Sequence, residues 1–125
     1  MSQSAAAIAS IAIINKSAPY GSSNAQESLD MALAMSNFAQ DVSVFFIEDG
    51  VLQLLVSQDP TVINAKAYHK TFAALEFYDI ENIYVCKHSL FQRGIEASQL
   101  CIPVTLIELE DLSKLLSKLQ HVMTF

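Results

Sequence analysis

A buried strand changes into a short basic turn of helix within the stretch IYVCKHSLFQRG, residues 83–94. Cys86 lies at this change, at the carboxyl end of the predicted strand and near the helix amino terminus. Backbone N–H groups and the helix dipole favour a negative charge at such a place, and therefore a thiolate. Lys87, His88 and Arg93 follow closely, in a chain with only seven Lys and Arg residues. Cys86 is therefore the candidate reactive residue, with Lys87, His88 and Arg93 in support.

A packing role is the alternative interpretation of Cys86, because free cysteine is among the most buried residue types. The second cysteine, Cys101, has no basic neighbours and is interpreted as structural. The chain contains no CxxC motif and no His at ligand spacing from either cysteine, so it predicts neither a metal site nor a disulfide framework. His69 and His121 are interpreted as surface residues. The sequence gives no reason to expect a cofactor.

The length of 125 residues fits one domain, residues 1–125, in which residues 1–6 are expected to form a flexible tail. Hydrophobic residues make up 52% of the chain and charged residues only 16%. A short chain of this kind is expected to bury more than its own core, and therefore to form an oligomer. The formal net charge of −6 argues against direct binding of nucleic acid, which requires a basic face.

The apolar run Ala5–Ile14 resembles neither a signal peptide nor a membrane anchor. No basic residue precedes it, and it is shorter than the roughly twenty residues that a bilayer span needs. We therefore expect no membrane segment. A reactive free thiol fits a reducing compartment, so the predicted location is the cytoplasm.

Strands and helices alternate along the chain. The predicted strands are residues 8–14, 42–47, 80–85, 101–107 and 121–125, and the predicted helices are residues 24–38, 64–77 and 110–119. This alternation predicts an α/β fold: a single three-layer domain with a mostly parallel five-stranded sheet and helices on both faces.

Two loops follow predicted strands at the edge where such sheets hold their sites. The loop Ser17–Asn24 lacks the spacing of a phosphate loop and has one Gly where a dinucleotide fingerprint needs three. After the second strand, Gly50 is expected to adopt a positive φ. The adjacent carboxylates of Glu48 and Asp49 are interpreted as solvated or capping groups, since no His accompanies them.

Several motifs resemble the TusC/DsrF family of the DsrE/DsrF-like sulfur-relay proteins. They are SAPYG at residues 17–21, ESLDMAL at 27–33, VFFIEDGVLQLL at 44–55, YDIE at 78–81, and Val85-Cys86 followed by Ser89-Leu90 and Arg93-Gly94. The likeness extends from about Ile8 to Phe125. The sequence departs from the family pattern at Lys87-His88, where small residues are common, and at Phe91-Gln92, where a more charged pair is usual.

The resemblance implies a cytoplasmic hetero-hexamer of TusB-, TusC- and TusD-type subunits that passes persulfide sulfur toward 2-thiouridine at the wobble position of tRNA. It also implies upstream and downstream sulfur-transfer partners. In sulfur oxidisers, DsrF-type relatives serve dissimilatory sulfur metabolism instead. In the TusD or DsrE kind, the cysteine after the third strand carries the persulfide, and Cys86 occupies the corresponding place.

Three functions remain open at this stage. The first is a structural or accessory subunit of the relay, a non-catalytic partner of a TusD-like carrier. The second is an active persulfide carrier that uses Cys86. The third is a small nucleotide- or phosphate-binding module that uses the loop Ser17–Asn24. A homo-oligomer is possible when the chain is isolated from its partners.

Overall fold

A computed structural model describes residues 10–18, 24–37, 41–54, 75, 80, 82–100 and 102–125. The expected tail of residues 1–6 and Cys101 lie outside the described residues. So do most of the loop Ser17–Asn24 and, apart from Leu75, the predicted helix over residues 64–77.

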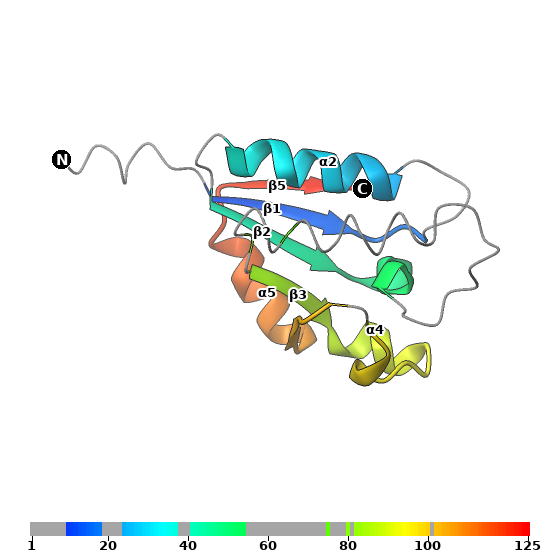
Figure 1. The fold of residues 1–125 in the computed structure, drawn as a ribbon. Coiled ribbons are helices and arrows are strands. Elements are labelled where there is room, and N and C mark those ends of the chain that lie inside the picture. The colour runs from blue at the N-terminus through cyan, green and yellow to red at the C-terminus, as the bar shows by residue number, and fades with distance from the viewer. Residues whose placement is uncertain are drawn as a thin grey trace.

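Five parallel strands form one sheet, as the alternation predicts (Figure 1). The strands are β1 (Ser10–Asn15), β2 (Asp41–Phe46), β3 (Asn82–Cys86), β4 (Thr105–Ile107) and β5 (His121–Thr124). Their order is β4-β3-β2-β1-β5, and each neighbouring pair is parallel. All the strands therefore end at the same edge, where α/β proteins hold their ligands.

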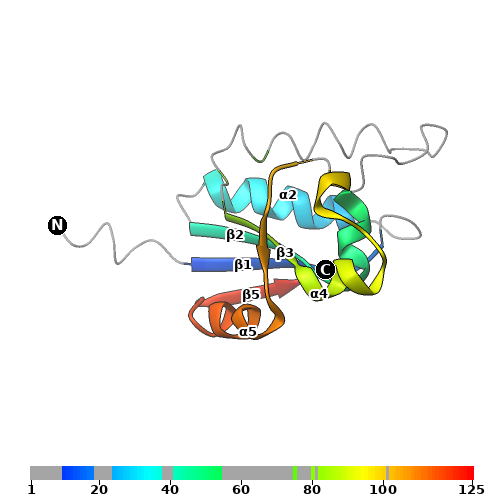
Figure 2. The same cartoon turned by 90° about the horizontal axis from the view of Figure 1, so that it is seen from below.

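Helices cover the two faces of the sheet (Figure 2). The long helix α2 (Asn24–Asn37) lies on one face, and the shorter helix α5 (Leu109–Ser117) lies on the other. The turn η1 (Glu48–Leu54) follows β2, the helix α4 (Lys87–Gln92) follows β3, and the turn η2 (Ala97–Gln99) comes before β4. The described elements therefore form the predicted three layers.

Strand β1 shows why the sheet needs cover on both sides. Its side chains alternate between the faces, as the pleat of a strand requires. Ile11 and Ile13 pack on the α2 face, whereas Ala12 and Ile14 pack on the α5 face. All four are buried, so the continuous apolar run in the sequence reflects burial on both faces.

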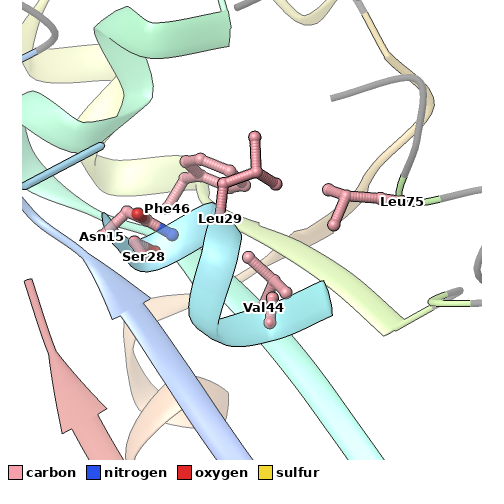
Figure 3. A pocket seen from close by; sticks show the side chains of 7 residues that line it. Asn15, Ser28, Leu29, Val44, Phe46 and Leu75 are labelled. Carbon is pink, nitrogen blue, oxygen red and sulfur yellow. The ribbon is translucent and has the colours of Figure 1, made fainter. Parts of the chain in front are cut away.

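A small void lies between α2 and the sheet (Figure 3). It has a volume of about 10 Å³ and is lined by Asn15, Ser28, Leu29, Ala32, Val44, Phe46 and Leu75. Asn15 uses its side-chain amide to donate a hydrogen bond to the carbonyl of Phe45, 3.3 Å away. A void of this size holds at most about one water molecule, so it is a packing defect and not a ligand site.

Two local predictions need correction. The fourth strand, predicted over residues 101–107, begins at Thr105, and the described residues 102–104 lie outside it, since Pro103 has no N–H to offer a neighbouring strand. A positive φ occurs at Glu48, with a value of 50°, and not at Gly50. Gly50 is required for another reason: a Cβ at this position would lie 1.9 Å from the carbonyl oxygen of Asn15.

Candidate functional site

Cys86 is the last residue of β3 and the N-cap of α4, so the strand passes into the helix without a loop. Its backbone is still extended, with φ −70° and ψ 116°. After α4, Gly94 has a φ of 65° and its N–H binds the carbonyl of Phe91, which confirms the predicted glycine stop. The residue Cys86 is only 2% exposed. The local sequence thus holds a buried cysteine at the strand end, in the predicted position.

A hollow of about 430 Å³ lies beside Cys86, and we call it the Cys86 hollow. Its lining comes from the ends of four strands and from α4 and α5: Ile14, Lys16, Ile47, Glu48, Cys86, His88, Ser89, Gln92, Leu109, Leu112 and Thr124. It therefore lies at the carboxyl edge of the parallel sheet, the usual place for a site in this architecture.

The structure places the three predicted supporting residues differently. His88 lines the Cys86 hollow, but Lys87 and Arg93 do not. Lys87 forms an ion pair with Glu108, with 3.0 Å between Nζ and Oε1. Arg93 donates to Oδ1 of Asp49 through Nε at 3.2 Å and Nη2 at 2.9 Å. A carboxylate thus offsets the positive charge of each of these two cations.

We did not predict Asp49 or Ser89 as site residues from the sequence, yet both accept hydrogen bonds from Arg93. Arg93 also donates through Nη1 to the carbonyl of Ser89, at 3.1 Å. The hydroxyl oxygen of Ser89, a buried residue, accepts the backbone N–H of Glu48 at 2.9 Å. We call Asp49, Ser89 and Arg93 the Arg93 clamp. The only sequence signal for it was that all three lie within the family-like motifs.

The clamp surrounds a strained residue. Glu48 adopts a left-handed backbone with φ 50°, a conformation that costs a non-glycine residue about 1–2 kcal/mol. Such strain persists only where neighbouring contacts hold the backbone in place. Here the hydrogen bond from the Glu48 N–H to Ser89 provides one such contact.

A second hollow of about 340 Å³ lies next to the first and shares His88 and Leu109 with it. Two large apolar side chains are exposed on its lining: Phe91 is 83% exposed and Leu109 is 51% exposed. An exposed apolar surface beside a hollow is typical of a contact with another protein.

In the part of the chain that the structure describes, no three His, Cys, Asp or Glu side chains gather as a metal site would need. No helix there is long and apolar enough to cross a bilayer. The chemistry that the Cys86 hollow offers is that of a thiol in a lining that also holds an imidazole, a carboxylate and the ammonium of Lys16.

Comparison with known proteins agrees with the sequence motifs. The model of the DsrE/DsrF-like family matches residues 9–125. A TusC homologue from Aliivibrio fischeri is 40% identical over 115 residues, covering 92% of this chain and 98% of that protein. A TusC homologue from Vibrio parahaemolyticus is 38% identical, covering 88% and 93% respectively.

A solved structure confirms the fold. The crystal structure of the ychN protein from E. coli superposes with a TM-score of 0.79 at 26% identity, and the match covers 94% of this chain and all of the other. The fold of this structure agrees with the α/β domain described here. The chain therefore belongs to the DsrE/DsrF-like family.

Proposed function

We propose that this chain is a subunit of a cytoplasmic sulfur-relay complex that passes persulfide sulfur toward 2-thiolation of the tRNA wobble uridine. Its role is mainly that of a structural and accessory partner of a TusD-like carrier, together with a TusB-like subunit. The observation that carries this proposal is the likeness to TusC homologues at 38–40% identity over most of the chain.

The environment of Cys86 favours the accessory role over the carrier role. Transfer of sulfur requires a thiolate that an incoming persulfide can reach. Cys86 is only 2% exposed, and carboxylates pair with both Lys87 and Arg93. This arrangement gives the thiol less access than the sequence alone led us to expect, and it pairs two of the three predicted supporting residues with carboxylates, although Lys16 also lines the hollow.

The exposed side chains beside the hollow support a protein partner. Phe91 and Leu109 present apolar surface where the second hollow meets the Cys86 hollow. Covering such surface removes it from water, which favours association. We place the contact with a sulfur-transfer partner at this end of the sheet.

The position of Cys86 supports a second candidate function, in which this chain itself carries persulfide sulfur. In such a step the Cys86 thiolate attacks the outer sulfur of a donor persulfide, R–S–SH. The S–S bond of the donor breaks, Cys86–S–SH forms, and R–S⁻ leaves, so no oxidant is needed. The Cys86 hollow, at the site edge of the sheet, is the observation that favours this candidate.

Removal of the gene for this chain from its host tests the function, with 2-thiouridine in tRNA measured by nucleoside mass spectrometry. We expect the modification to fall and the wild-type chain to restore it. Restoration by Cys86→Ser supports the accessory role, and failure of this variant supports the carrier role. An unchanged level of 2-thiouridine would contradict the tRNA proposal, and a defect in sulfur oxidation instead would indicate the DsrF-type function.

Co-expression with the TusB-like and TusD-like subunits of the same host tests the partnership. Light scattering after size-exclusion chromatography should show one complex that contains all these subunits. Phe91→Ser should weaken the complex if the apolar surface near the hollow is the contact. Elution of the chain apart from both partners would contradict the proposed complex.

A further inference from the structure

Helix α4 and the turn after β2 are joined by the Arg93 clamp. Within it, Arg93 reaches Oδ1 of Asp49 at 2.9 and 3.2 Å and the carbonyl of Ser89 at 3.1 Å. The Ser89 hydroxyl accepts the N–H of Glu48 at 2.9 Å. Asp49 and Arg93 are 44 residues apart in the sequence. These contacts therefore connect the turn η1, which follows β2, with the helix α4, which follows β3.

The same two elements line the Cys86 hollow. Glu48 contributes from the end of β2, whereas Cys86, His88 and Ser89 contribute from the end of β3 and from α4. These two elements therefore form part of the wall of the hollow, and α5 forms another part. Because Cys86 is only 2% exposed, a reagent reaches its sulfur only when some of this wall moves.

The contacts of the Arg93 guanidinium indicate whether its charge acts on the thiol or on its own binding partners. Its side chain is 24% exposed, that of Asp49 is 57% exposed, and its guanidinium nitrogens bind one carboxylate oxygen and one carbonyl. Arg93 does not line the Cys86 hollow. A cation satisfied in this way holds two backbone segments together, and it is poorly placed to stabilise a thiolate.

We propose that Arg93 is a positioning residue whose clamp on Asp49 and Ser89 keeps the Cys86 hollow narrow and limits access to the thiol. Release of the clamp lets the strained turn at Glu48 move away from α4 and opens a path to the sulfur. This inference goes beyond the proposed function and holds whether or not Cys86 carries sulfur, because the clamp is a property of the isolated fold.

Alkylation of the folded chain by iodoacetamide tests the clamp, with peptide mapping to separate Cys86 from Cys101. Arg93→Ala and Asp49→Ala should each raise the rate at Cys86 by about two- to fivefold, as expected when a half-exposed pair that limits local opening is lost. The double variant should be no faster than the faster single variant, because each change breaks the same contact.

The alkylation rates distinguish an effect of the Arg93 charge on the thiol from the proposed positioning role of Arg93. If Arg93 acted through its charge, Arg93→Ala would slow alkylation and Asp49→Ala would accelerate it. Arg93→Lys separates the two accounts further, because lysine keeps the charge but loses the fork of donors. The clamp predicts a rate for Arg93→Lys close to that of Arg93→Ala, and a wild-type rate for this variant would overturn the proposal.

Two controls exclude general effects. Lys114→Ala removes an exposed positive charge from α5 and should leave the rate at Cys86 unchanged. Leu29→Ala destabilises the opposite face of the sheet and, well below its own unfolding transition, should also leave that rate unchanged. Equal acceleration by Leu29→Ala would show that alkylation follows global unfolding and would overturn the clamp.

None of these rates depends on tRNA thiolation, so the failure of one proposal is distinguishable from the failure of the other.

Discussion

The two faces of the sheet differ in how completely they are covered. On the α2 face, the described residues form a large buried cluster that includes Leu29, Phe46 and Val85. On the α5 face, the described buried cluster has only Ala12, Ile14, Phe45 and Leu112, and the side chains around it are half-buried. One face therefore supplies most of the hydrophobic stability, while the other leaves space for the Cys86 hollow.

Helix length explains part of the difference. Helix α2 has 14 residues, whereas α5 has nine and buries only Leu112 fully. The stacked rings of Phe45 and Tyr84, with centroids 5.1 Å apart, fill part of the remaining surface. The strand register places Cys86 opposite Ile107 and next to Val85, whose side chain points to the other face. Cys86 therefore shares the thinly covered face with its hollow.

The largest expected effect is on the α2 face. Leu29→Ala should lower the free energy of unfolding by about 3–4 kcal/mol, because Leu29 is 3% exposed and already borders a small void that its loss would enlarge. Urea unfolding followed by circular dichroism measures this loss. A loss below about 1 kcal/mol would mean that the α2 face is not the main core.

The matching substitution on the α5 face should lower the free energy of unfolding by a smaller amount. Leu112→Ala should lower the free energy of unfolding by about 2 kcal/mol, because its half-buried neighbours Leu115 and Leu116 can move into the space. The same urea experiment compares the two leucine variants directly. An equal or larger loss than that of Leu29→Ala would remove the distinction between the faces.

The smallest expected effect is a gain at the edge of the Cys86 hollow. Glu48→Gly should raise the free energy of unfolding by about 0.5 kcal/mol, because glycine adopts a φ of 50° without the steric cost that glutamate meets. Thermal unfolding by calorimetry is sensitive enough to show it. Asp49→Gly is the matched control and should destabilise, since it gains no backbone relief and loses the contact with Arg93. A loss of stability in Glu48→Gly would mean that Glu48 is not strained.

Local patterns in the sequence were sufficient for the five strands and for helices α2 and α5, whereas the predicted helix over residues 64–77 stays a prediction. Apolar runs predicted the strands, and the stretch around Cys86 predicted both the strand end and the glycine stop at Gly94. These features depend on neighbours within a few residues. The sequence also indicated that Cys86 would lie at the carboxyl edge, since parallel strands end together.

The pairing of charges could not be predicted in the same way. Lys87 and Glu108 are 21 residues apart, and Arg93 and Asp49 are 44 apart. Such contacts depend on the strand order and on the position of α4, neither of which is written in a local pattern. The basic residues near Cys86 therefore suggested an activated thiol, whereas the structure shows that carboxylates pair with two of them. The left-handed turn at Glu48 was not predicted for the same reason, because its N–H donates a hydrogen bond to the hydroxyl of Ser89, 41 residues away.

The most direct test of the accessory role is intact-mass spectrometry of this chain in complex with its TusD-like partner, after loading with a persulfide donor. We predict that the gain of one sulfur, about 32 Da, appears on the partner and not on this chain, because Cys86 is buried and carboxylates pair with its neighbours Lys87 and Arg93. A gain of the same mass on this chain, lost in Cys86→Ser, would contradict the account and identify Cys86 as a working carrier.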